Sequence, residues 1–274
     1  MRLRFPAALL FALGLLLSGA ASATEEAGVL IDRAIAGDHR SPVDRARDVH
    51  RHPRETLLFM GLRPDMTVVE IWPAAGWFSD ILAPVLHERG RLLLARHPVS
   101  LPKTPEVVRK RDQAFLARMA TRPDVYGKVV TSEIQAPGLV DVAPPGTVDL
   151  VLTFRNVHNW AKSGTAEAMF RAFFQMLKPG GVLGVEEHRA RPGTSLDDQI
   201  ASGYMDVDTV VAWATAAGFR FDASSEVNAN RRDTKDHPMG VWTLPPTLRL
   251  GDQDREKYLA IGESDRMTLR FVRP

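Results

Sequence analysis

Short runs of β-branched and other apolar residues alternate with helical patterns through most of this chain. Each run is long enough for one strand, and the segments between the runs repeat apolar residues at helical spacing. Strands that alternate with helices form β-α-β units, in which the two strands run parallel and the connection is right-handed. We therefore predict strands over residues 66–72, 91–95, 128–134, 147–154 and 181–187, with helices over 76–87, 105–120 and 165–177.

The pattern changes after residue 187. A helix over residues 206–218, closed by Gly218, precedes two strands over residues 219–227 and 267–272 that fit an antiparallel pair. The predicted fold is α/β, a Rossmann-like doubly wound sheet that is mostly parallel with an antiparallel last strand. The long segment 228–265 carries Pro238, Pro245 and Pro246, and loops of that length are usually functional or partly disordered.

The N-terminus is typical of an export signal. Arg2 and Arg4 precede an apolar run over residues 7–17, and Ala21-Ser22-Ala23 offers a small-residue cleavage site. The run is shorter than the roughly 20 residues of a membrane-spanning helix, so we expect no stable membrane anchor after cleavage. We predict a signal peptide over residues 1–23 cleaved after Ala23, a periplasmic or secreted protein, a helical lead-in over 24–61 and a Rossmann-like domain over 62–274.

The amino-acid composition limits the classes of ligand that this protein is expected to bind. The chain has 274 residues, 45% of them apolar, which is enough for one sizeable core. Without residues 1–23, 33 basic residues face 33 acidic ones, so no cationic surplus indicates nucleic acid. The chain has no cysteine, which excludes disulfides and thiolate chemistry. We predict a small-molecule ligand, no nucleic acid and no metal, and the sequence leaves the oligomeric state open.

Polar residues follow the predicted strands, at the edge where a parallel sheet forms its ligand crevice. Burying so many polar groups after an apolar strand is costly unless they meet a ligand, solvent or each other. We expect Asn156 to orient a substrate and His158 to accept its proton, since imidazole titrates near neutral pH. The other candidates at this edge are Arg155, Asn159 and His188.

Three segments together resemble class I S-adenosylmethionine-dependent methyltransferases. Glu70-Ile-Trp-Pro-Ala-Ala-Gly76 is similar to their first motif, an acid followed by three alternating glycines. Asp149 resembles the acid of their second motif, and Leu177-Lys-Pro-Gly-Gly181 resembles the turn before their fifth strand. A narrower resemblance, to exported bacterial proteins described as predicted methyltransferases, rests on Arg51-His-Pro53, Glu70-Ile-Trp-Pro73, Asn156-Val-His-Asn-Trp160, Thr234-Lys-Asp-His-Pro238 and Gly262-Glu-Ser-Asp-Arg266.

The resemblance implies S-adenosyl-L-methionine as cofactor and methyl transfer to an unidentified small-molecule acceptor. Trp72 and Ala74 stand where the family has glycines, and Arg96 stands where it commonly has an acid that binds the ribose. The cofactor-binding residues that the resemblance implies are Glu70, Trp72, Ala74, Gly76, Trp77, Arg96 and Arg155.

Two other functions fit the same crevice. One is a repurposed or inactive methyltransferase-fold protein that binds a ligand in the periplasm. The other is a hydrolase or lyase built on His158, Glu186 and His188; alternation along a strand puts Glu186 and His188 on one face and Glu187 on the other. In either case the segment 228–265 can act as a lid that supplies Arg231 and Arg232 to an anionic substrate.

Overall fold

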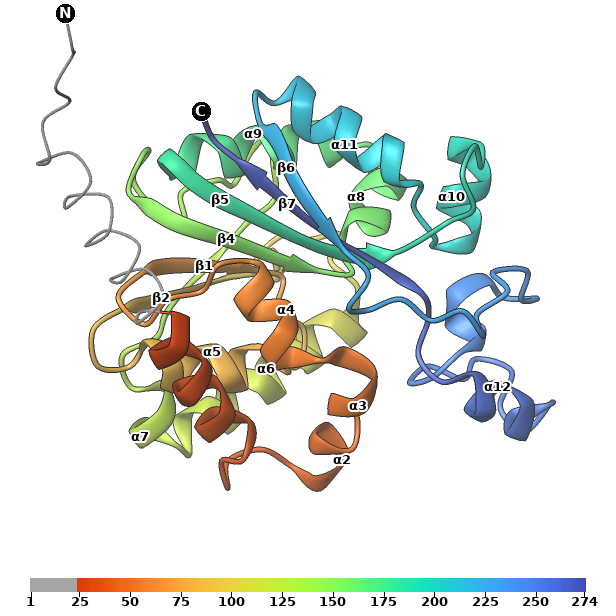
Figure 1. Cartoon of the computed structure of the whole chain (residues 1–274), viewed down its shortest axis with the longest axis horizontal. Helices are drawn as coiled ribbons and strands as arrows, with labels where there is room; N and C mark the ends of the chain where they lie inside the picture. Colours follow the sequence, from red (N-terminus) through yellow and green to blue (C-terminus); the bar gives the residue numbers. More distant parts are fainter. Residues whose placement is uncertain (1–23) are drawn as a thin grey trace, which may run out of the picture.

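The structure, a computed structural model, describes residues 24–274 and contains one seven-stranded sheet (Figure 1). The predicted signal peptide over residues 1–23 lies outside the described residues. The strand order is β3-β2-β1-β4-β5-β7-β6. The strands are β1 (Thr67–Ile71), β2 (Arg91–Arg96), β3 (Val130–Glu133), β4 (Val148–Phe154), β5 (Leu177–His188), β6 (Arg220–Ser225) and β7 (Arg266–Val272).

The pairing confirms the predicted sheet. β1 pairs in parallel with both β2 and β4, and β4 pairs in parallel with β5. β7 runs antiparallel between β5 and β6. The central strand β4 is buried over almost its whole length, which explains why its sequence is nearly continuous in apolar residues. The carboxyl ends of β1, β2, β4 and β5 therefore meet at one edge.

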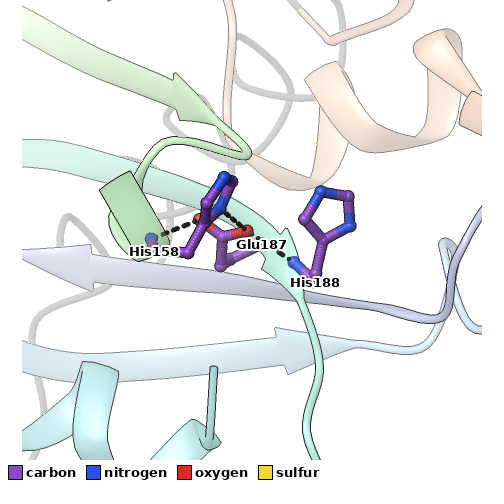
Figure 2. A group of neighbouring side chains, drawn as sticks. All are labelled: His158, Glu187 and His188. Atoms are coloured by element: carbon purple, nitrogen blue, oxygen red, sulfur yellow. Dashed lines mark hydrogen bonds and ion pairs between the residues drawn. The ribbon is translucent and has the colours of Figure 1, made fainter. Parts of the chain in front are cut away.

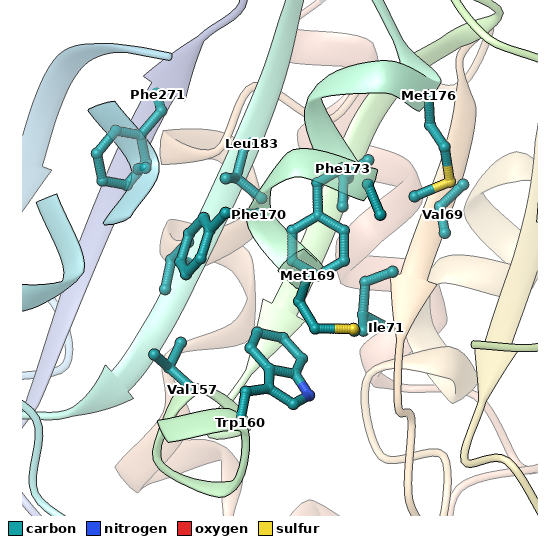
Figure 3. Packing of buried hydrophobic residues seen from close by; sticks show 14 of the residues in the cluster. Val69, Ile71, Val157, Trp160, Met169, Phe170, Phe173, Met176, Leu183 and Phe271 are labelled. Atoms are coloured by element: carbon teal, nitrogen blue, oxygen red, sulfur yellow. The ribbon is translucent and has the colours of Figure 1, made fainter. Parts of the chain in front are cut away.

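Helices cover one face of the sheet, and the larger of the two main apolar clusters lies between these helices and the strands. In α9 (Ala166–Met176) Met169, Phe170, Phe173 and Met176 recur at helical spacing and are buried. Figure 3 shows these side chains packed with Trp160 between the helix and the strands. The helices of this layer are α8 (Val157–Ser163), α9, α10 (Leu196–Ser202) and α11 (Val207–Ala216).

The opposite face carries the N-terminal segment, which is helical. It includes a helix over residues 24–35, and Ile31, Leu57 and Met60 pack there against Val68 and Leu150 of the sheet. The helices of this side are α2 (Pro42–Arg45), α3 (Asp48–Arg51), α4 (Pro53–Phe59), α5 (Ser79–Leu86), α6 (Glu106–Ala120) and α7 (Pro123–Tyr126). No helix within residues 24–274 is long and apolar enough to cross a membrane.

The segment between β6 and β7 is mostly irregular. It holds a short 3₁₀ helix η1 (Gly240–Thr243) and α12 (Arg255–Ile261), and it lies beside the sheet at the end where β5 finishes (Figure 1). The short helices α7, α8, α10 and α12 were not predicted, because each has only one or two turns and too few residues to show a helical period.

Candidate functional site

A cavity of about 420 Å³ opens at the carboxyl ends of the parallel strands. It brings together nine of the predicted site residues, which come from β1 and the segment after it, from the segment after β4 and from the end of β5. Gly76, Arg96, Arg231 and Arg232 are not part of its lining. The predicted residues that line the cavity are Glu70, Trp72, Ala74, Trp77, Arg155, Asn156, His158, Asn159 and His188.

The backbone of the loop after β1 is left-handed at residues 72, 74 and 76, the three positions where the resembled motif has glycine. Only the last of these residues is glycine in this chain. The φ angles are +48° at Trp72, +57° at Ala74 and +85° at Gly76. A non-glycine residue in this region is disfavoured by roughly 1–2 kcal/mol, because Cβ approaches the following carbonyl. A Cβ added at Gly76 would lie 2.1 Å from a ring carbon of Phe115, so this position has room only for glycine. The left-handed conformation is therefore present at all three positions, although Trp72 and Ala74 are not glycine.

Trp72 lines the cavity and is largely buried. Its indole is 8% exposed, and its Nε1 donates to the carbonyl of Ile134 at 3.1 Å. The indole stacks on the ring of His97, with centroids 4.1 Å apart. The stacked rings of Trp72 and His97 therefore connect the ends of β1 and β2.

Glu70 is a buried carboxyl group in the cavity wall. It is 2% exposed, and one of its oxygens accepts a hydrogen bond of 2.6 Å from the Ser79 hydroxyl at the start of α5. Burial raises the pKa of Glu70 to about 8, which the Ser79 bond opposes and the nearby Asp80 reinforces. Glu70 is therefore mostly a neutral acid at pH 7 and can donate a hydrogen bond as well as accept one.

Arg96 does not line the cavity, although it was predicted to bind the cofactor. Its guanidinium pairs with Asp112 of α6, which directs it away from the ligand edge. The next residue, His97, takes the cavity position instead. Burial, with a smaller effect of Arg111, lowers the pKa of His97 to about 4, so its ring is neutral at pH 7.

The segment after β4 is fastened to the neighbouring strands. Asn156 donates from Nδ2 to the carbonyl of Ile71 at 2.9 Å, which ties the segment to the end of β1. Arg155 has a φ of +60°, and its backbone N–H donates to the carbonyl of Glu186 at 2.7 Å. Asn156 thus uses donors of its amide group to position the loop that carries His158.

His158 is held by Glu187, a residue that the sequence analysis placed away from the cleft. His158 Nδ1 lies 3.0 Å from a carboxylate oxygen of Glu187, which also accepts the backbone N–H of His188 at 2.8 Å (Figure 2). Glu187 projects toward α8, in whose first turn His158 lies. The sequence signal for this contact is weak, because it depends on two segments that are 29 residues apart.

His188 lies beside His158, with ring centroids 5.4 Å apart, and its Nδ1 lies 2.5 Å from the Ser264 hydroxyl. Burial and the neighbouring cationic groups lower the pKa of His188 well below its usual range. His158, Glu187 and His188 each offer a ligand atom within 4.8 Å of the others, so these three residues could hold a metal ion.

Arg51 and Glu263 complete the wall from opposite ends of the chain. Arg51 is 1% exposed, and its Nε donates to Glu263 at 3.2 Å. Its guanidinium also lies over the indole of Trp77, 4.6 Å from the ring centroid. Neither Arg51 nor Glu263 was predicted as a site residue, although both lie in motifs of the narrower resemblance.

The segment 228–265 covers the cavity with apolar side chains. Trp242, Pro245 and Pro246 line it, whereas Arg231 and Arg232 are exposed and lie outside the lining. Asp233, which is buried, anchors the segment by accepting hydrogen bonds from the Tyr204 hydroxyl and from the backbone N–H of Asp265. The segment 228–265 therefore contributes to the cavity wall, but Arg231 and Arg232 do not reach it.

Asp149, the acid of the second motif, lies at the other end of the sheet. It accepts the backbone N–H of Thr67 at 2.8 Å and pairs with Lys178 at 2.7 Å. Asp149 therefore joins the starts of β1, β4 and β5 and has no place in the cavity.

Comparison with solved structures assigns the fold. The [4+2]-cyclase SpnF matches with a TM-score of 0.58 and 16% identity, over 87% of this chain and 85% of that one. A SAM-dependent methyltransferase from Aquifex aeolicus matches with a TM-score of 0.51 and 16% identity, over 69% of this chain and 88% of that one. This chain has the class I methyltransferase fold.

A third solved structure carries the cofactor. Phosphoethanolamine N-methyltransferase 2 from Haemonchus contortus, in complex with S-adenosyl-L-methionine, matches with a TM-score of 0.51 and 13% identity, over 82% of this chain and 52% of that one. No protein-family model matches the sequence, and a search of curated proteins gives no match either. The likeness is therefore one of fold.

Proposed function

We propose that this protein is an S-adenosylmethionine-dependent methyltransferase that acts on a small-molecule acceptor. The observation that carries the proposal is the loop at Trp72, Ala74 and Gly76, which keeps a left-handed backbone at all three alternating positions. Strained backbone at non-glycine residues persists where the surrounding structure imposes it, and such strain clusters at ligand sites. This loop helps to line the cavity at the carboxyl ends of the parallel strands of a methyltransferase fold.

The residues present fit such a cofactor in part. Trp72, Pro73 and Ala74 of the loop line the cavity together with the neutral acid Glu70. At the end of β2 the neutral ring of His97 stands near the place of the usual acid, and a neutral imidazole has one acceptor nitrogen for a hydroxyl group. When bound, S-adenosylmethionine would supply an electrophilic methyl group.

The chain's own residues would orient the acceptor and remove its proton. Glu187 accepts a hydrogen bond at His158 Nδ1, which fixes the ring and leaves Nε2 as the basic nitrogen. Asn156 holds the loop of His158 on β1 and acts by positioning. Trp242, Pro245 and Pro246 would limit the access of water from the side of the segment 228–265.

A second candidate is a methyltransferase-fold protein with another ligand or another reaction. The observation that favours it is the indole of Trp72, which stacks on His97 where the family presents bare glycine and an acid. The fold is compatible with other chemistry, because one solved protein that shares it is described as a [4+2]-cyclase.

Calorimetry with S-adenosylmethionine and S-adenosylhomocysteine tests the first proposal. We expect both to bind the purified protein, and we expect Glu70→Ala to abolish binding, since Glu70 lines the cavity. Asp149→Ala is the matched control, because this acid lies at the opposite end of the sheet and should leave binding unchanged. Absence of binding of both compounds at about 1 mM, a free energy weaker than roughly −4 kcal/mol, would favour the second candidate.

We also propose that the protein is exported, with cleavage after Ala23. Support comes from the charged, apolar and small-residue regions of residues 1–23. N-terminal sequencing of the protein purified from a periplasmic extract should begin at Thr24. A full-length chain confined to the cytoplasm would contradict export.

A further inference from the structure

Arg51 has an unused donor in the cavity wall. Its Nε is bound to Glu263, but its Nη2 is fully buried and has no hydrogen-bond partner among residues 24–274. A buried guanidinium nitrogen without a partner is costly, because it has lost water and gained nothing in return. Arg51 is one of the residues that line the cavity.

Arg155 also lines this cavity and also has a buried nitrogen without a hydrogen-bond partner within residues 24–274. It is partly buried, and its Nε has no hydrogen-bond partner in the described part of the chain. After burial, Arg155 is the strongest influence that lowers the pKa of Arg51, which shows that the two cationic groups act on each other. Two guanidinium groups, each with one buried nitrogen that has no partner among the described residues, therefore line one cavity.

The charges around this wall do not balance. Arg47, Arg51 and Arg266 all pair with Glu263, and Arg266 also pairs with Glu186 at 3.1 Å. With Arg155, four guanidinium groups share the two carboxylates of Glu186 and Glu263. Even if Glu187 is added, arginines outnumber acids in this cluster. Buried charge without a partner is strongly disfavoured, so a further anion would stabilise this cluster.

We propose that Arg51 and Arg155 form an anion-binding subsite of the cavity that recognises a carboxylate or phosphate group of the ligand. Arginine suits this role because its planar fork of donors matches both groups. The subsite also explains two sequence motifs that the proposed function leaves unused, Arg51-His-Pro53 and Gly262-Glu-Ser-Asp-Arg266. The first motif supplies Arg51, and the second supplies Glu263 and Arg266, which hold its guanidinium group and neighbouring loop in place.

The anion has two possible sources. One is the carboxylate of the amino-acid part of S-adenosylmethionine, and the other is an acidic group of the acceptor. This identification rests on the proposed function, whereas the subsite itself rests on the buried guanidinium groups. The test below separates the two sources.

The first measurement is titration of the purified protein with inorganic phosphate, at an ionic strength held constant with chloride. We expect phosphate to bind, and we expect Arg51→Met and Arg155→Met each to weaken it at least tenfold, since hydrogen bonds between charged groups contribute that much or more. Arg63→Met is the matched control, because Arg63 pairs with Asp65 on the exposed surface and lies outside the cavity. Phosphate that binds no better than chloride, or binds both cavity variants like the wild type, overturns the proposal.

If both methionine variants fail to fold, selenate soaked into crystals of the wild-type protein gives the second measurement. Anomalous density within hydrogen-bond distance of Arg51 Nη2 and Arg155 supports the subsite, and its absence from the cavity overturns it.

The second arm identifies the source of the anion. Phosphate is titrated again with saturating S-adenosylhomocysteine or with 5′-methylthioadenosine, which lacks the amino-acid part. Exclusion of phosphate by the first compound alone assigns the anion to the cofactor carboxylate, and binding in the presence of both assigns it to the acceptor. Phosphate binding without any binding of S-adenosylhomocysteine supports the subsite while the proposed methyltransferase function fails.

Discussion

The two walls of the cavity are built in different ways. The loop after β1 depends on backbone: its φ angles are positive at Trp72, Ala74 and Gly76 although two of the side chains are not glycine. The wall around Arg51 and Glu263 depends on side-chain charge, and it joins residues that are 212 positions apart in the chain. The comparison shows that a backbone feature can survive sequence change locally, whereas a charge cluster requires several distant segments together.

The charged wall should be the more sensitive of the two. Glu263→Ala removes the carboxylate that pairs with Arg47, Arg51 and Arg266, and it leaves three cationic groups short of a partner. We expect the free energy of unfolding to fall by about 3–5 kcal/mol, measured by chemical denaturation. Glu226→Ala is the control: Glu226 pairs with Arg189 but is 70% exposed, so its loss should cost about 1 kcal/mol or less. Equal losses in the two variants would mean that the wall is not held by buried charge.

The loop should show the next largest effect. Gly76→Ala introduces a Cβ at a φ of +85° and 2.1 Å from Phe115, so strain and overpacking add. We expect a loss of about 3 kcal/mol in the free energy of unfolding. Gly146→Ala is the control, because Gly146 has a φ of +68° with no heavy atom within 4 Å of the added Cβ, and the conformational penalty alone is about 1 kcal/mol. If both glycines gave the same loss, close packing at Gly76 would play no part.

The smallest expected effect is the change in the free energy of unfolding with pH that the titration of Glu70 causes. Its pKa is raised from 4.5 to about 8 in the folded protein, so the folded state holds a proton that the unfolded state releases. Stability is therefore favoured at low pH and falls as pH rises between these values. His97 has the opposite sign, since its lowered pKa destabilises the fold as pH falls below 6.5 toward about 4.

The effect of Glu70 dominates between pH 6.5 and 8, because His97 is neutral in the folded state and loses its remaining proton in the unfolded state near the lower end of this range. We expect the free energy of unfolding to fall by about 1 kcal/mol across this window, with a slope of about half a proton. Glu70→Gln should flatten the slope, whereas Glu55→Gln on the exposed surface of α4 should keep it. An unchanged slope in Glu70→Gln would show that another group carries the titration.

Much of the fold could be predicted from periodicity. The strands β1, β4 and β5 and the helix α9 have apolar patterns that are long enough to identify, and the antiparallel position of the last strands was also predicted correctly. Short helices such as α8 were not predicted, because seven residues show hardly two turns of a helical repeat. The candidate residues after β4 were found because polar side chains directly follow a buried strand.

The orientation of side chains around the cavity could not be predicted in the same way. Arg96 and His97 are neighbours in the sequence, yet His97 faces the cavity and Arg96 pairs with Asp112 of α6. Glu187 points away from the face expected for the cleft and still holds His158, because α8 packs on that side. In each case the deciding partner comes from a different element, and its position depends on packing.

The sequence by itself determined the class of fold and the edge of the sheet where a ligand would lie, because hydrophobic periodicity and strand ends are local properties. Only the tertiary structure decided that Trp72 stacks on His97, that Glu187 holds His158, and that Arg51, Arg155 and Glu263 share one wall. Those contacts depend on burial, which changes the cost of each charge and is set by segments far apart along the chain.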